Sequence, residues 1–194
     1  MGKLTLRFGV WLAAVLFSGA AFAQCTTTTA KDDLEDQEIQ ALYECIQSQM
    51  REGYAKGDNE WAKDYHINWK PASTQPAAPG FHGGRFLMTF VNDTGHAEYI
   101  KFEEERAPMP VGSLIAKESF NVSKKGEAKV GPLFFMEKVA AGTADEYGNW
   151  VYSAVTPGGK VMGIKQSFCH DCHNNYEDQD ALGYPVEDYR VSAQ

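Results

Sequence analysis

Two cysteines and a histidine near the carboxyl end have the types and spacing of a covalent cofactor site. In the segment QSFCHDCHNNYED, residues 166–178, two residues separate Cys169 from Cys172, and His173 follows directly. Two thiols at this spacing can each add to one vinyl group of a single haem, and the next residue then lies under the iron as an axial ligand. The pattern therefore predicts one haem c attached through Cys169 and Cys172, with His173 as the iron ligand.

Three other chemistries use similar residues. A redox-active dithiol shares the Cys-x-x-Cys spacing, but it belongs at the start of a helix in a βαβ pattern and does not need the histidine. A zinc site could recruit His170, but four ligands within five residues would strain a tetrahedral shell, and the sequence has no second Cys/His cluster. A disulfide across two residues would be strained. The complete five-residue motif favours haem.

The amino terminus has the pattern of a secretory signal peptide. Lys3 and Arg7 precede an apolar run over residues 8–17, and Ala-Phe-Ala at 21–23 is a small-x-small cleavage site. The run is too short for a membrane span, and no later run approaches that length. We therefore expect residues 1–23 to be removed and the product to be soluble in the periplasm.

The other two cysteines, Cys25 and Cys45, flank an acidic helical stretch. Because an exported chain meets an oxidising compartment, we predict a structural disulfide between them. A lipid anchor on Cys25 is the alternative, but Gln24 before it is too large for a usual lipobox.

Length and charge limit the classes of function. Residues 24–194 suit a single domain with its own core. Loss of the two leader cations changes the formal net charge from −8 to −10, and an acidic surface disfavours nucleic acid but favours a basic redox partner.

Hydrophobic periodicity predicts an α+β fold. Leu42, Ile46 and Met50 recur every four residues and indicate a helix over 32–56, within a helical layer over about 24–70. Short runs rich in β-branched and aromatic residues follow, and a short helix over 95–105 separates the first two. These runs predict antiparallel strands at 85–91, 113–120, 131–139, 149–155 and 160–164. We expect the amino-terminal helix to pack on this sheet, with the sheet and haem site over about 80–176 and the cysteine motif in the carboxy-terminal segment.

Several segments together resemble the cytochrome P-460 family, which includes the beta-sheet cytochromes c-prime. They are FHGGRFLMTFVND, APMPVGSLIAKESF, FFMEKV, GNWVYSAVTPGGKV and CHDCH, within residues 65–176. The resemblance implies one haem packed against an antiparallel sheet, and a homodimer. It assigns the thioether bonds to Cys169 and Cys172, and the axial ligand to His173.

The resemblance also directs attention to the other face of the iron. The namesake enzymes oxidise hydroxylamine and carry a lysine cross-linked to the porphyrin; the corresponding segment here contains Lys101, whose alternative is a surface lysine. The c-prime relatives cap an apolar pocket with phenylalanine and bind nitric oxide or carbon monoxide. The candidates for such a cap are Phe81, Phe86 and Phe102.

His82 is a further distal candidate, because the two glycines after it let the backbone approach a cofactor closely. It could ligate the iron, or it could hydrogen-bond a bound ligand; a turn histidine in solvent is the alternative. Arg85 could balance a haem propionate or a bound anion. Met88, Met109, Met136 and Met162 are candidate sulfur ligands or packing residues.

Three functions fit these patterns. The first is a c-type haem protein that binds or redox-transforms small nitrogen species such as nitric oxide or hydroxylamine, as an oxidoreductase if it is an enzyme. The second is a six-coordinate electron-transfer cytochrome. The third is a non-catalytic haem module that senses or scavenges gas.

Overall fold

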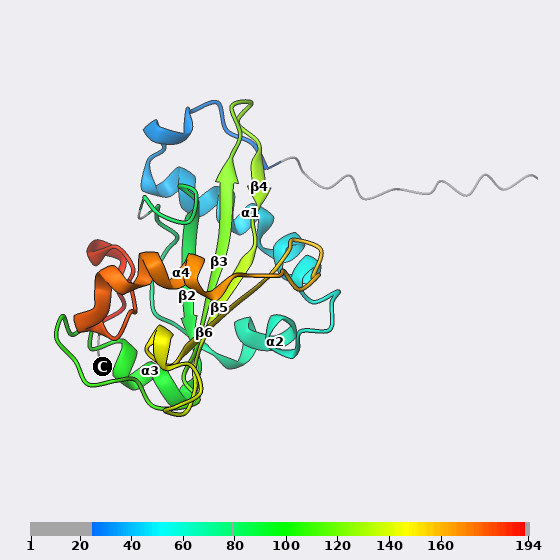
Figure 1. Ribbon diagram of the computed structural model, residues 1–194. Helices are drawn as coiled ribbons and strands as arrows, with labels where there is room; N and C mark the ends of the chain where they lie inside the picture. Colours follow the sequence, from blue (N-terminus) through cyan, green and yellow to red (C-terminus); the bar gives the residue numbers. More distant parts are fainter. Residues whose placement is uncertain (1–24, 79, 193–194) are drawn as a thin grey trace, which may run out of the picture.

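The structure is a computed structural model that describes residues 25–78 and 80–192 (Figure 1). The signal peptide expected over residues 1–23 lies outside the described residues. Among the helices of the described residues, none is long and apolar enough to cross a membrane.

One antiparallel sheet forms the centre of the described chain. Its central path runs β1-β2-β3-β5-β6, and β4 pairs with the far end of β3. The strands are β1 (Lys70–Pro71), β2 (Phe86–Val91), β3 (Leu114–Val122), β4 (Ala128–Val130), β5 (Leu133–Lys138) and β6 (Trp150–Val155). Together with the helices, this sheet confirms the predicted α+β class.

The helices lie before, between and after the strands: α1 (Asp36–Tyr54), α2 (Glu60–Asn68), α3 (Asp93–Tyr99) and α4 (Gln166–His173). Helix α1 begins with a capping box in which the side chains of Glu35 and Glu38 each accept from the other residue's backbone N–H. Short 3-10 turns lie at Lys31–Asp33, Asp145–Tyr147, Asn174–Gln179 and Glu187–Tyr189.

The apolar side chains of α1 and α2 pack on one face of the sheet. Ile46 and Met50 of α1 and Tyr65 of α2 are buried there with Phe90 and Phe120 of the sheet. A disulfide joins Cys25 to Cys45 and so fastens the start of the described chain to α1. This layer occupies one face of the sheet and leaves the other face to α3, α4 and the carboxy-terminal segment.

The opposite face carries a second cluster, where Val91, Ile115 and Met136 of the sheet are buried with Tyr99 of α3 and Leu182. Figure 1 shows α4 on the opposite side of the sheet from α1. The two faces thus have separate cores, and alternation along each strand decides which core a side chain joins.

Two predicted elements differ from the structure. The segment 160–164 is not a strand: it makes one isolated bridge, Val155 to Val161, before the chain turns into α4. The helix predicted over 95–105 is α3 and ends at Tyr99, because Phe102 has a left-handed φ of 50° and helical geometry stops before it. Helix α2 and strand β4 come from segments in which the sequence pattern predicted no separate element.

Candidate haem site

A cavity of about 580 Å³ lies between the sheet and the carboxy-terminal segment. Its floor is formed by side chains of β2, β3, β5 and β6 that face away from α1 and α2, including Leu87, Ile115 and Met136. A volume of this size is typical of pockets that enclose a drug-sized or cofactor-sized molecule. Six of the predicted site residues line the cavity: Phe81, His82, Arg85, Cys169, Cys172 and His173.

Helix α4 brings the cysteine motif to this cavity. Cys169, Cys172 and His173 occupy positions i, i+3 and i+4, which lie on one face of a helix. The side-chain amide of Gln166 fixes the start of the helix to β6, because it accepts from the Tyr152 N–H at 2.7 Å and donates to the Tyr152 carbonyl at 2.8 Å. The helix therefore presents both thiols and the imidazole at the cavity wall.

His173 is buried and its tautomer is fixed by the backbone. Its Nδ1 donates to the Ala181 carbonyl oxygen at 2.7 Å, which leaves Nε2 as the nitrogen that can bind a metal. Burial, followed by the charge of Lys117, lowers the pKa of His173 to about 4. The imidazole is therefore neutral at pH 7, the form that a metal requires.

His82 lies across the cavity from His173. Its backbone has a φ of 54°, a left-handed conformation shared by the neighbouring Gly83 and Gly84. The two imidazole ring centres are 6.2 Å apart, and the ring planes are at 89° to each other. A metal held about 2.0–2.1 Å from one nitrogen of each ring would separate the ring centres by roughly 6 Å. Burial lowers the pKa of His82 to about 3, so this imidazole is also neutral.

Lys117 of β3 also lines the cavity, and the sequence patterns did not single it out. It is 8% exposed, and its Nζ donates to the Gly183 carbonyl at 2.9 Å. Burial lowers its pKa to about 8. The sequence signal that could have found it is the charged pair Lys117 and Glu118 inside the apolar strand LIAKESF, because a charge in a buried strand has to face a polar partner or a site.

The polar groups at the cavity suit a cofactor that is mostly apolar and carries carboxylates. Arg85 brings a guanidinium, whose Nη1 donates to the His82 carbonyl at 2.6 Å. The Nε2 of Gln75 is buried without a hydrogen-bond partner, which leaves a donor available to a bound group. An apolar floor, two neutral imidazoles and these donors fit a haem with its propionates.

Three predicted residues lie outside the cavity lining. Lys101 follows α3 and its Nζ pairs with Glu98 Oε2 at 2.8 Å on the exposed surface. Phe86 points to the other face of the sheet, where its ring packs on Phe120 at 5.0 Å between ring centres. Phe102 packs on Tyr184 behind the cavity wall.

The methionines divide in the same way. Met136 and Met162 line the cavity, whereas Met88 and Met109 pack in the two cores. Within the described residues, no group of three or more His, Cys, Asp and Glu side chains is arranged to hold a metal ion, which is the arrangement that a zinc site would need.

The α+β fold and the apolar cavity with two opposed imidazoles fit a haem-binding protein. Residues 62–182 match the family described as Cytochrome P460, and the chain belongs to that family. A search of curated proteins found no match. The resemblance seen in the sequence segments is thereby confirmed at the level of the family.

Proposed function

We propose that this protein is a periplasmic c-type cytochrome whose single haem binds or redox-transforms small nitrogen species such as nitric oxide or hydroxylamine. The observation that carries the proposal is that α4 places Cys169, Cys172 and His173 together at the wall of an apolar cavity. Membership of the Cytochrome P460 family supports the same assignment. The disulfide between Cys25 and Cys45 supports an oxidising compartment.

Each residue has a distinct part in holding the cofactor. The Sγ atoms of Cys169 and Cys172 would form the thioether bonds, and His173 Nε2 would bind the iron. Arg85 and Gln75 would hold the propionates. When bound, haem supplies a one-electron Fe(III)/Fe(II) couple and an iron that can accept a small ligand. The apolar side chains that line the cavity would surround that ligand.

Lys117 supports the hydroxylamine-oxidising branch of this function. Of the two lysines, Lys117 faces the cavity, whereas Lys101 is paired with Glu98 on the surface. A pKa near 8 leaves about a tenth of the amine neutral and nucleophilic at pH 7. We therefore assign any lysine–porphyrin cross-link to Lys117. If it forms, trypsin cannot cut after Lys117, and peptide 107–124 is recovered joined to the haem peptide 166–190; separate peptides would assign the protein to the branch without a cross-link.

A six-coordinate electron carrier is the second candidate, and the position of His82 favours it. Its ring lies at the separation from His173 that two ligands of one iron would have. In this arrangement His82 would have to leave the iron before a small ligand could bind. The two candidates therefore differ in how readily the reduced protein takes up carbon monoxide.

Optical spectra with carbon monoxide separate the candidates. A ligand-binding protein changes its reduced spectrum at once on addition of carbon monoxide, whereas a six-coordinate carrier does not. His82→Ala removes the competing ligand, and it should raise the apparent affinity about tenfold if the wild-type site is open about a tenth of the time. A wild type that ignores carbon monoxide while His82→Ala binds it would favour the electron carrier. A wild type and a variant that both ignore it would contradict an open iron site.

A further inference from the structure

The carbonyl that accepts the hydrogen bond from His173 belongs to a turn with an unusual backbone. Asp180 and Ala181 have φ values of 55° and 61°, in the left-handed region that non-glycine residues seldom adopt. Alanine has no polar side chain with which to stabilise this conformation locally. Two consecutive residues of this kind persist only where the surrounding contacts hold them.

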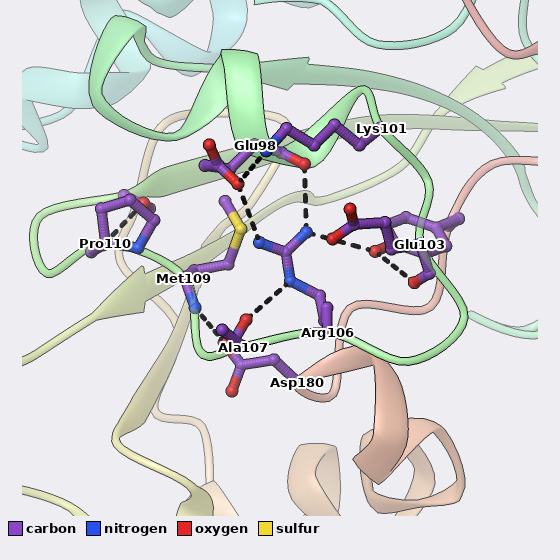
Figure 2. A network of polar contacts seen from close by, with 10 residues as sticks. Glu98, Lys101, Glu103, Arg106, Ala107, Met109, Pro110 and Asp180 are labelled. Carbon is purple, nitrogen blue, oxygen red and sulfur yellow. Dashed lines mark hydrogen bonds and ion pairs between the residues drawn. The ribbon is translucent and has the colours of Figure 1, made fainter.

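The contacts that hold the turn converge on Asp180. Its Oδ1 accepts from Lys138 Nζ at 2.6 Å, and its Oδ2 accepts from the Met109 N–H at 2.7 Å. Its backbone carbonyl accepts from Trp150 Nε1 at 2.8 Å. Figure 2 shows the Asp180 side chain reaching the Met109 backbone, beside the contact between Arg106 of the same loop and Glu98 of α3.

Lys138 is as firmly held as Asp180. The two side chains are 5% and 11% exposed, so their ion pair is screened from water. The ammonium also donates to the Gly148 carbonyl at 2.8 Å and lies 4.9 Å from the centre of the Trp150 ring. Strand β5 and the loop before β3 are thus bound to the Asp180 carboxylate, and strand β6 is bound to the Asp180 backbone carbonyl.

We propose that Asp180 and Lys138 form a carbonyl anchor, which fixes the Ala181 oxygen as the acceptor for His173 Nδ1–H and so sets the strength of the axial ligand. The proposal depends on the haem attachment described above. An imidazole whose Nδ1–H is held by a well-placed acceptor is a more basic ligand, and a more basic ligand stabilises Fe(III) over Fe(II). Asp180 and Lys138 act through His173 and are therefore positioning residues.

The test compares Asp180→Asn and Lys138→Met in the haem-loaded protein. If the anchor positions the carbonyl, both changes weaken the His173 hydrogen bond, so both raise the reduction potential. Simple through-space electrostatics predicts opposite shifts, because the first removes a negative charge and the second a positive one. Shifts of opposite sign, or no shift in either variant, would overturn the proposal.

Glu118→Gln is the matched control, because Glu118 is a buried carboxylate on the other face of the sheet, paired with Arg51 at 2.9 Å. It should lower stability without moving the potential. A second readout is the exchange of the His173 Nδ1–H with D₂O, followed by NMR in protein labelled with ¹⁵N-histidine. We expect slow exchange in the wild type and faster exchange in both anchor variants.

Three results separate failure of the anchor from failure of the proposed function. If neither variant acquires haem, the test is the exchange of the His173 Nδ1–H with D₂O in the wild type. Loss of the Nδ1–H signal within the mixing time would overturn the anchor. If the wild type carries no haem by intact mass, the proposed function fails first. If the wild type carries haem and the variants have unchanged potential and exchange, the anchor alone fails.

Discussion

Lys117 and Glu118 are adjacent on β3 and point to opposite faces of the sheet. Lys117 faces the cavity, where it has a backbone carbonyl as partner, and Glu118 faces the helices, where it accepts from Arg51 Nε and from the hydroxyl groups of Tyr43 and Tyr65. Glu118 is 1% exposed and has three donors. The carboxylate is thus fully compensated within the fold, whereas the amine remains available for chemistry in the cavity.

The lowered pKa of Lys117 predicts a pH-dependent stability when the amine is free. Its pKa is about 8 in the folded chain and about 10.4 when unfolded, so between these values the unfolded chain binds more protons and stability rises with pH. We expect the free energy of unfolding of the wild type to increase, relative to Lys117→Met, by about 1.6 kcal/mol from pH 8 to pH 9.5. Urea titrations at several pH values measure this difference.

The comparison with Lys117→Met removes the contributions of other groups. Burial raises the pKa of Tyr43, Tyr54 and Tyr65, so these tyrosines oppose the trend only as pH approaches 10 and above, and they do so equally in both proteins. A difference between the two proteins that stays constant from pH 8 to pH 9.5 would contradict a buried free amine at position 117.

At the residue scale, the sequence predicted which residues a local spacing groups together. It did not predict which face of the sheet a side chain joins, because that depends on strand pairing. Cys169, Cys172 and His173 could be proposed together because a helix turn alone brings positions i, i+3 and i+4 to one side. Phe86 could not be assigned to a face, because the register of β2 decides whether it or Leu87 meets the cavity.

At the scale of elements, the junction between β6 and α4 positions the site. After Met162, whose N–H donates to the Ala154 carbonyl, the chain leaves the sheet edge. The side chain of Gln166 then makes the two hydrogen bonds to Tyr152 that a continued strand would have made. The run at 160–164 has the apolar composition of a strand, and the sequence pattern predicted one there. A side-chain amide in place of a backbone partner is not visible in a hydrophobic pattern, which is why that prediction was wrong.

Gln166→Ala should destabilise the protein by about 1–3 kcal/mol, because it leaves the N–H and carbonyl of Tyr152 without partners at a partly buried edge. Urea unfolding followed by circular dichroism measures the loss. Gln37→Ala is the control, since Gln37 is exposed on α1, and it should change stability by less than about 0.5 kcal/mol. Equal effects of the two substitutions would show that the Gln166 amide does not hold the junction.

The strands themselves were largely predictable. Those near 85–91, 113–120, 131–139 and 149–155 correspond to β2, β3, β5 and β6, because their β-branched and aromatic residues are typical of half-buried or buried strands. Strand β4 has three residues and no apolar periodicity of its own; its pairing with β3 creates it. The order of strands in the sheet also depends on contacts between distant segments, which local patterns do not contain.

At the scale of the molecule, the disulfide between Cys25 and Cys45 closes a loop of 20 residues at the amino-terminal end of the described chain. A loop of this length is expected to contribute about 3 kcal/mol to stability by constraining the unfolded chain. We therefore expect the double substitution Cys25→Ser and Cys45→Ser to lower the free energy of unfolding by about that amount.

The haem spectrum of this double variant should be unchanged, because the disulfide lies with α1 on the face of the sheet away from the cavity. Chemical denaturation gives the stability, and the absorption spectrum at low denaturant gives the state of the site. An altered spectrum in folded protein would mean that the amino-terminal layer shapes the site directly.

The central claim is that one haem is bound covalently through Cys169 and Cys172. The most direct measurement is the intact mass of protein matured in a host that attaches haem c, together with that of Cys169→Ser/Cys172→Ser. The account predicts one haem above the mass of the processed wild-type polypeptide, and none on the double variant. Wild-type protein that is colourless and has only the polypeptide mass would contradict it.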